Sequence, residues 1–308
     1  MPTRRLGRSN LSIEPLVFGT NVIGGTIDEP QSFKVLDAFV AEGFTAIDTA
    51  DIYTKGSSET IIGNWLQARG NRDKVLIFTK VGADNGTGAR DNSAKWITQG
   101  VENSLRRLKT DYIDLYQTHW LDGHTPQEET LGTYAKLVEA GKVRILGASN
   151  FDTALLREAL DISAANGWPR YETLQNEYNL YARDSFEEVQ RLCVEEEVSG
   201  IHYFSLARGF VSGKYRTEAD ASKSPRGPAV IQRYFNDKGF RLLAALDRVH
   251  ARTKESLTAI ALAWLNAQPG SAAPIARAST IEQVKELARG ARLTLSAEDL
   301  KDLTDAGR

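Results

Sequence analysis

The chain has 308 residues, of which 41% are hydrophobic and 25% charged, and its formal net charge is −2 at pH 7. This composition is near the average for folded globular proteins, and the near-neutral charge, without a run of about five like charges, argues against a nucleic-acid-binding or anionic-membrane-binding surface. The one cysteine, Cys193, excludes an intramolecular disulfide and a cysteine zinc cluster.

The N-terminal residues MPTRRLGRSNLSIEP lack an apolar core of signal-peptide length. The longest apolar stretches, such as 257–265, are shorter than the roughly 20 residues that a membrane-spanning helix needs. We therefore expect a cytoplasmic protein that binds small molecules, with no nucleic-acid partner and no membrane partner. A monomer is the default expectation.

Apolar runs of strand length alternate along the chain with longer segments of helical periodicity. The expected strands lie near 16–19, 44–48, 75–80, 112–117, 143–148, 172–175, 199–204 and 273–276. The expected helices lie near 31–43, 57–69, 93–108, 127–140, 152–165, 183–197, 238–251 and 256–267. The alternation predicts an α/β fold, a (β/α)8 TIM barrel. Since such barrels commonly form one domain of about 250 residues, residues 1–308 are expected to form a single domain.

Two helix starts carry capping signals. Asp152 precedes TALLREAL and is an expected N-cap. Asp184 precedes SFEEVQRL and is expected to form a capping box with Glu187.

Three segments lie outside the repeated βα units. Residues 3–13 are expected to form an N-terminal β-hairpin at the bottom of the barrel. Residues 280–289 and 296–307 predict two extra C-terminal helices. The segment 217–237, rich in proline, glycine and small polar residues, is too long for an ordinary connection. It is predicted to be a mobile loop over a bound cofactor or substrate, with an unspecialised surface insertion as the alternative.

Polar residues stand at or just after the ends of apolar, strand-like runs. Asp48 and Tyr53 follow the first of these runs, Lys80 ends the second and His119 follows the third. Because the carboxyl ends of parallel barrel strands converge, these residues are expected to lie close together. A tyrosine phenol has a reference pKa near 10 and needs a cation beside it to act as an acid at neutral pH. Lys80 can supply that cation, Asp48 can hold Lys80 in place, and His119 can donate to a substrate oxygen. This inventory indicates protonation of a carbonyl while a bound nicotinamide donates hydride.

Each of these residues also has a simpler interpretation. Asp48 and Lys80, taken alone, can be a structural ion pair, because buried pairs occur without catalysis. Tyr53 and His119, taken alone, can be ordinary core residues. His124 follows His119 by five residues and not by four on a helix, so no metal site is indicated. Neither GxGxxG after a strand nor GxxxxGK[ST] is present, which argues against the Rossmann and P-loop classes.

Taken together, the motifs resemble those of the aldo-keto reductase family, from near Arg4 to the end of the chain. The resemblance rests on GFTAIDTADIY at 43–53, TK at 79–80, QTHW at 117–120, GASNF at 147–151, LQNEYNL at 174–180, YFSLARGFVSGKYR at 203–216 and PIARASTIEQVKE at 274–286. The YFSLA sequence at 203–207 resembles a recognisable subgroup of bacterial-like members. The spacing of these motifs, each at the close of its own βα unit, is more specific than any one motif.

The resemblance implies a catalytic tetrad and an NADPH or NADP+ cofactor. The tetrad consists of Asp48, Tyr53, Lys80 and His119, with Tyr53 as the general acid during reduction. The residues implied to hold the nicotinamide are Ser149, Asn150 and Gln175 at the carboxamide and Tyr203 under the ring. Further implied cofactor residues are Gly19, Thr20, Asp48, Phe204, Ser205, Leu206, Ala207, Gly209 and Lys214, with Ala276, Arg277, Ser279, Gln283 and Glu286 at the adenosine end. The N-terminus of the 280–289 helix would favour a cofactor phosphate.

One departure from the family pattern concerns the choice of cofactor. Many relatives have Gly-Ala-Arg where this chain has Arg277-Ala278-Ser279, so Ser279 replaces the arginine that usually faces the 2′-phosphate. Arg277 and Lys214 can still bracket that phosphate. NADPH is therefore expected, and NADH remains possible.

The substrate is expected to be a small carbonyl compound. Asn21 and Trp120 are candidate pocket residues, with packing at the barrel rim as the alternative for Trp120. Arg90, Arg226 and Arg233 lie in predicted loops and can either meet an anionic substrate or be solvated surface charge.

Two alternative functions remain open at the level of sequence. The first is a catalytically slow NADP(H)-binding subunit with a redox-sensing or regulatory role. The second is dehydrogenation of a sugar or steroid alcohol, in which Tyr53 would act as the base.

Overall fold

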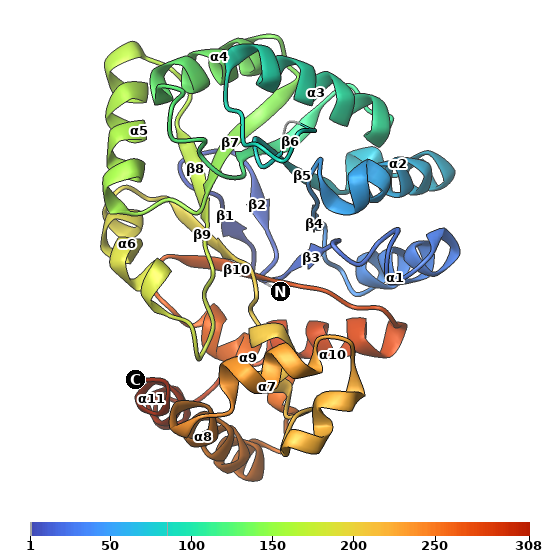
Figure 1. Ribbon diagram of the computed structural model, residues 1–308, viewed down its shortest axis with the longest axis vertical. Coiled ribbons are helices and arrows are strands. Elements are labelled where there is room, and N and C mark those ends of the chain that lie inside the picture. Colours follow the sequence, from blue (N-terminus) through green and yellow to red (C-terminus); the bar gives the residue numbers. More distant parts are fainter. Residues whose placement is uncertain (1, 85) are drawn as a thin grey trace.

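The computed structural model describes residues 2–84 and 86–308. Within these residues, eight parallel strands form a closed barrel (Figure 1). Around the barrel the order is β10 (Ser271–Ala276), β3 (Val17–Gly19), β4 (Ala46–Asp48), β5 (Leu76–Val81), β6 (Ile113–Thr118), β7 (Val143–Ser149), β8 (Tyr171–Gln175) and β9 (Ser199–His202). The structure confirms the predicted (β/α)8 TIM barrel, and the observed strands lie close to the expected ranges.

Side chains inside the barrel form an apolar layer with a polar layer beyond it. Phe78 of β5 and Leu115 of β6 belong to one buried apolar cluster, to which other barrel strands also contribute. Side chains on a strand alternate between its two faces, so Lys80 and Gln117, two residues further on, point into the same interior. Because the strands are parallel, these polar side chains lie together at the carboxyl end of the barrel.

Helices surround the barrel (Figure 1). They are α1 (Glu29–Ala41), α2 (Ser57–Arg69), α3 (Ala94–Leu108), α4 (Gln127–Glu139), α5 (Thr153–Asn166), α6 (Asp184–Glu195), α8 (Asp237–Thr253) and α9 (Leu257–Asn266), with the short 3-10 helices η1 (Tyr53–Gly56) and η2 (Arg72–Lys74). On α3, Ile97, Val101 and Leu105 recur every four residues and are buried. This apolar stripe is what a helix needs to pack on a sheet.

The two capping predictions have different outcomes. Oδ1 of Asp152 accepts the backbone N–H of Leu155 at 2.8 Å, which confirms the first. The prediction for Asp184 is wrong, because this residue is already the first of α6 and the preceding Arg183 provides no side-chain cap. Glu187 instead accepts a hydrogen bond from Nε of Arg183 at 2.7 Å.

The N-terminal hairpin is present as predicted. Its strands β1 (Arg4–Arg5) and β2 (Ser12–Ile13) are antiparallel. Leu6 and Ile13 join the apolar cluster inside the barrel, so the hairpin closes the end opposite the polar layer.

The two extra C-terminal helices are also present, as α10 (Ile281–Arg292) and α11 (Ala297–Ala306). The first packs against α9 and α1, and the second packs against α8. Among the helices of residues 2–84 and 86–308, none combines the length and the apolar character that crossing a membrane requires.

The segment 217–237 has more regular structure than a mobile loop would have. After η3 (Ala207–Ser212), it contains the 3-10 helix η4 (Glu218–Lys223) and the helix α7 (Gly227–Tyr234). The ring of Tyr234 stacks on Phe210 with 5.0 Å between centroids, which attaches α7 to η3. The prediction of a loop is therefore wrong for these residues.

Candidate active site

A buried ion pair lies at the carboxyl ends of β4 and β5. Nζ of Lys80 is 2.6 Å from Oδ2 of Asp48 and donates to the carbonyl oxygen of Thr49 at 2.7 Å. Oδ1 of Asp48 accepts from Nε2 of Gln117 at 3.2 Å and from Nε2 of Gln175 at 3.0 Å. Both charges are thus compensated by a partner and by hydrogen bonds, as burial of charge requires.

The other two predicted catalytic residues adjoin this pair. The hydroxyl of Tyr53, on η1, lies 3.5 Å from Nζ of Lys80. The ring of His119 follows β6 and lies 6.1 Å from the Tyr53 ring between centroids, with the ring planes at 78°. The structure therefore brings together the four residues of the expected tetrad.

The backbone directly after Tyr53 is strained. Thr54 and Lys55 have φ angles of 49° and 55°, in the left-handed region that residues other than glycine rarely adopt. Oγ1 of Thr54 donates to the carbonyl oxygen of Ile23 at 2.7 Å, which ties this turn to the loop after β3. Strain of this kind concentrates at functional sites.

Burial and charge oppose each other at Tyr53 and Lys80. The pKa of Tyr53 is raised, chiefly because burial disfavours the phenolate, although the Lys80 charge lowers it. Burial acts to lower the pKa of Lys80, but Asp48 and Tyr53 outweigh this effect and the pKa of Lys80 is raised. The site thus holds a protonated phenol beside an ammonium. The charge of Lys80 lowers the pKa of Tyr53, as expected, but the effect of burial is larger.

His119 is neutral in this environment. Burial first, then the charges of Lys80 and Arg90, lower the pKa of His119 to about 3. Its Nδ1 is buried and has no hydrogen-bond partner among residues 2–84 and 86–308. The tautomer with a proton on Nε2 is therefore the one that can donate to a substrate.

The residues expected at the carboxamide form one hydrogen-bond network. Oγ of Ser149 donates to the carbonyl oxygen of Gln175 at 2.8 Å and accepts from Nδ2 of Asn150 at 3.0 Å. Asn150 also donates to the carbonyl oxygen of His119 and accepts from the hydroxyl of Tyr203. Oε1 of Gln175 and the second lone pair on Oδ1 of Asn150 are the acceptors that can meet an amide donor.

The segment from Phe204 to Gly209, which contains several of the implied cofactor residues, has an unusual backbone. Phe204, Ala207, Arg208 and Gly209 have φ angles of 52°, 46°, 57° and 93°. Oγ of Ser205 donates to the carbonyl oxygen of His202, three residues earlier, which holds this segment to β9. Left-handed and right-handed residues in succession can form a concave backbone surface that suits an anion.

The C-terminal loop expected at the adenosine end is fixed on both sides. Ala276 ends β10, and the N–H of Ser279 donates to Oε1 of Gln283 at 2.8 Å on α10. The carbonyl oxygen of Ser279 accepts from Nε2 of Gln31 at 2.8 Å on α1. Arg277, in this loop, and Glu286, on α10, are both half-buried.

The turn after β3 is less open to a ligand than expected. Gly19 pairs with Asp48 in the barrel. Oγ1 of Thr20 is buried, donates to the carbonyl oxygen of Asp48 at 2.9 Å and contacts Oγ of Ser58. Any contact of Thr20 with a cofactor would therefore come from its backbone, whereas Asn21 is exposed.

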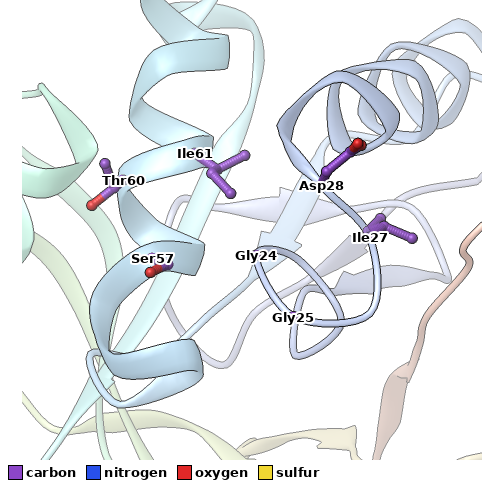
Figure 2. A pocket seen from close by; sticks show the side chains of 7 residues that line it. All are labelled: Gly24, Gly25, Ile27, Asp28, Ser57, Thr60 and Ile61. Carbon is purple, nitrogen blue, oxygen red and sulfur yellow. The ribbon is translucent and has the colours of Figure 1, made fainter.

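Figure 2 shows a hollow between the loop after β3 and the first turns of α2. Its volume is about 470 Å³, and its lining residues are Gly24, Gly25, Ile27, Asp28, Ser57, Thr60 and Ile61. The wall on α2 begins at Ser57, directly after η1. No residue of the tetrad lines this hollow, so it adjoins the tetrad without including it.

Comparison with known proteins agrees with this geometry. Residues 15–308 match the model of the Aldo/keto reductase family. The chain belongs to the aldo/keto reductase family. It is similar to the aldo-keto reductase YhdN of Bacillus subtilis (strain 168), at 35% identity over 92% of this chain and 87% of that protein. It is similar to the protein tas of Escherichia coli (strain K12), at 30% identity over 98% of this chain and 96% of that protein. The aryl-alcohol dehydrogenase [NADP(+)] of Phanerodontia chrysosporium is 29% identical to this chain over 99% of this chain and 87% of that protein.

In this aldo/keto reductase, reasoning from sequence missed the contact of Gln117 with Asp48. A signal existed, because Gln117 lies in an apolar strand two residues before His119 and two after the inward-facing Leu115. Gln31 was also missed, and there no signal existed, since its contact with Ser279 joins residues 248 positions apart.

Proposed function

We propose that this chain is an NADP(H)-dependent aldo-keto reductase that reduces aldehydes or ketones to alcohols, with Tyr53 as the general acid. The observation that carries the proposal is the 3.5 Å approach of the Tyr53 hydroxyl to Nζ of Lys80, itself 2.6 Å from Oδ2 of Asp48. The names of two relatives, the aryl-alcohol dehydrogenase [NADP(+)] and the aldo-keto reductase yakc [NADP(+)], support the choice of NADP(H).

The residues present fit this cofactor, which supplies hydride when bound. Acceptors on Gln175 and Asn150 suit the amide of a nicotinamide, and Tyr203 supplies an aromatic face beside them. The left-handed run ending at Gly209 suits the pyrophosphate. Arg277 would pair with a 2′-phosphate, while the serine at position 279 leaves NADH as a possible second donor.

The roles of the tetrad follow from its charge states. Tyr53 and the Nε2–H of neutral His119 both donate to the carbonyl oxygen of the substrate. As negative charge develops on that oxygen, these two hydrogen bonds strengthen, which stabilises the transition state more than the ground state. Tyr53 gives up its proton to the oxygen, Lys80 stabilises the resulting phenolate, and Asp48 keeps Lys80 in position. In the oxidising direction the same residues act in reverse, with Tyr53 as the base.

The test begins with fluorescence titrations of the purified protein with NADPH and NADH. Turnover of a panel of aldehydes, quinones, keto-sugars and ketosteroids follows. Tyr53→Phe should retain NADPH binding and lose nearly all reduction. Tyr112→Phe is the matched control, because this hydroxyl lies at the other end of the barrel, 3.5 Å from the carbonyl oxygen of Arg72.

Equal turnover by Tyr53→Phe and the wild type would remove Tyr53 from the proposed role. Tight NADPH binding without steady-state turnover of any panel member would favour the sensing or regulatory function over catalysis.

A further inference from the structure

Arg90 is held against the residue that follows the tetrad histidine. Its Cζ lies 4.6 Å from the centroid of the Trp120 ring, and its Nη1 donates to the carbonyl oxygen of Leu121 at 3.2 Å. Trp120 is half-buried and directly follows His119. A guanidinium stacked on an indole face is attracted by the ring and loses part of its freedom to move. The exposed side chain of Arg90 is therefore held against the residue that follows His119.

The charge of Arg90 reaches the reacting end of the site. It contributes, after burial and Lys80, to the lowered pKa of His119. Lys80 is neutralised by Asp48, so its charge is already balanced. The contacts of Arg90 among residues 2–84 and 86–308 are the Trp120 ring and the Leu121 carbonyl, and no carboxylate there pairs with it.

Two other charged residues, Arg233 and Asp122 (next to Leu121), already have partners. The carboxylate of Asp122 accepts from the backbone N–H of Asn92 at 2.8 Å and from Oγ1 of Thr125 at 2.6 Å. Arg233, another arginine in a predicted loop, pairs with Glu177 at 3.0 Å. Arg90 differs from Arg233 because its charge remains available to a ligand.

We propose that Arg90, stacked on Trp120, is the subsite that binds a carboxylate on the carbonyl substrate. The preferred substrates are then oxo-acids, meaning aldehydes or ketones that also carry a carboxylate, and this inference rests on the proposed reductase function. A guanidinium offers two parallel N–H donors and a single positive charge, which match a planar monoanionic carboxylate. The indole face of Trp120 supplies apolar contact for the carbon skeleton between the two polar ends.

The experiment compares two substrates of nearly equal shape, 4-carboxybenzaldehyde and its methyl ester, with NADPH as the donor. The wild type should show a higher kcat/KM for the carboxylate. In Arg90→Gln, the ratio of the two kcat/KM values should fall by roughly tenfold to a hundredfold, as expected for loss of a charge-assisted hydrogen bond. Arg90→Lys should retain part of the preference, because the charge remains while the planar fork is lost.

The matched control is Arg106→Gln. Arg106 lies on α3, bonds to Asn103 one turn away and lines a hollow away from the tetrad with Arg72 and Lys109. This variant removes the same charge and should leave the ratio of the two kcat/KM values as in the wild type. An equal fall in the ratio for both variants would show a general charge effect and overturn the subsite.

Two further outcomes also overturn the subsite. One is a wild type that reduces the ester as well as the carboxylate. The other is an Arg90→Gln variant in which both substrates lose activity equally, because Arg90 would then only support Trp120. Absence of turnover with either aldehyde and with the whole carbonyl panel is a distinct result, since it would contradict the proposed reductase function itself. Near-ultraviolet circular dichroism and NADPH titration of each variant establish that the fold and cofactor site are intact.

Discussion

The hydroxyl of Tyr203 donates a hydrogen bond of 2.8 Å to Oδ1 of Asn150. Nδ2 of Asn150 in turn donates to the carbonyl oxygen of His119 at 3.0 Å. Asn150 has a φ of 62°, a left-handed value that such a network can hold in place. The proposed aromatic platform of the nicotinamide and the backbone of the proposed catalytic histidine therefore share one asparagine.

Tyr203→Phe tests this coupling, because it keeps the ring and removes only the hydrogen bond. The Kd for NADPH should rise roughly threefold to tenfold, the effect of one neutral hydrogen bond of about 1 kcal/mol. Fluorescence titration measures it. Tyr181→Phe is the control, since its hydroxyl bonds to the carbonyl oxygen of Arg233 outside this network. If both variants bind NADPH like the wild type, the Tyr203 hydroxyl does not organise the cofactor site.

Removal of Lys80 should be costly for stability as well as for catalysis. Lys80→Met leaves the Asp48 carboxylate buried without its cation and should lower the free energy of unfolding by about 3–5 kcal/mol. The double variant Lys80→Met with Asp48→Asn should recover much of that loss, because no unpaired charge remains. Urea unfolding of the three proteins measures both effects.

An exposed ion pair is the control for the Lys80 experiment. Arg191 pairs with Glu195 on the surface of α6, with side chains that are 90% and 51% exposed. Arg191→Met should change the free energy of unfolding by about 0.5 kcal/mol or less. A loss in Lys80→Met no larger than in Arg191→Met would mean that Asp48 is not buried as a charge.

The positions of Asp48, Lys80 and His119 could be expected from sequence, because each stands at or just past the end of an apolar run and parallel barrel strands end on one face. The side-chain hydrogen bonds could not be expected in the same way. Gln117 and Gln175 both reach Oδ1 of Asp48 from strands far away in the chain, and only the packed interior fixes those distances.

The error at 217–237 has a physical reason. Proline and glycine were taken to indicate an irregular loop, yet Gly227 and Pro228 occupy the first turn of α7. A proline is tolerated there because the first backbone N–H groups of a helix need no partner within the helix. The remaining residues of α7, AVIQRY, form an amphipathic turn whose Val230 and Tyr234 are buried.

Acid should destabilise the fold through two buried neutral histidines. Burial lowers the pKa values of His119 and His202 to about 3, whereas an unfolded histidine has a pKa near 6.5. Between these values the unfolded chain binds more protons than the folded one. Stability therefore falls as the pH drops from about 6.5 towards 3, by up to about 1.4 kcal/mol per pH unit for each histidine. Above about pH 6.5 neither histidine contributes to the change of the free energy of unfolding with pH.

His202→Met isolates one of these contributions. Both ring nitrogens of His202 lack partners among the described residues, and its ring packs against Tyr178 and Phe186. A flexible apolar side chain should fill this site with little loss of stability at pH 7. Urea unfolding from pH 7 to pH 4 should show a flatter decline for this variant than for the wild type. The exposed His124 supplies the control, and parallel curves for His202→Met, His124→Met and the wild type would contradict the assignment.

Gly227 lies where η4 and α7 contact each other. A Cβ on Gly227 would lie 1.8 Å from the carbonyl oxygen of Ala221, which is backbone and cannot move aside cheaply. Gly227→Ala should therefore separate the two helices and raise amide hydrogen exchange across 217–235 by about tenfold or more. If this segment covers the cofactor, as the sequence predicts, the same variant should also bind NADPH several-fold more weakly. Ala229→Ser is the control, because it adds an atom at an exposed position of the same helix. Hydrogen exchange measured by mass spectrometry decides the first point, and equal exchange in the two variants would mean that the close approach at Gly227 does not hold this segment together.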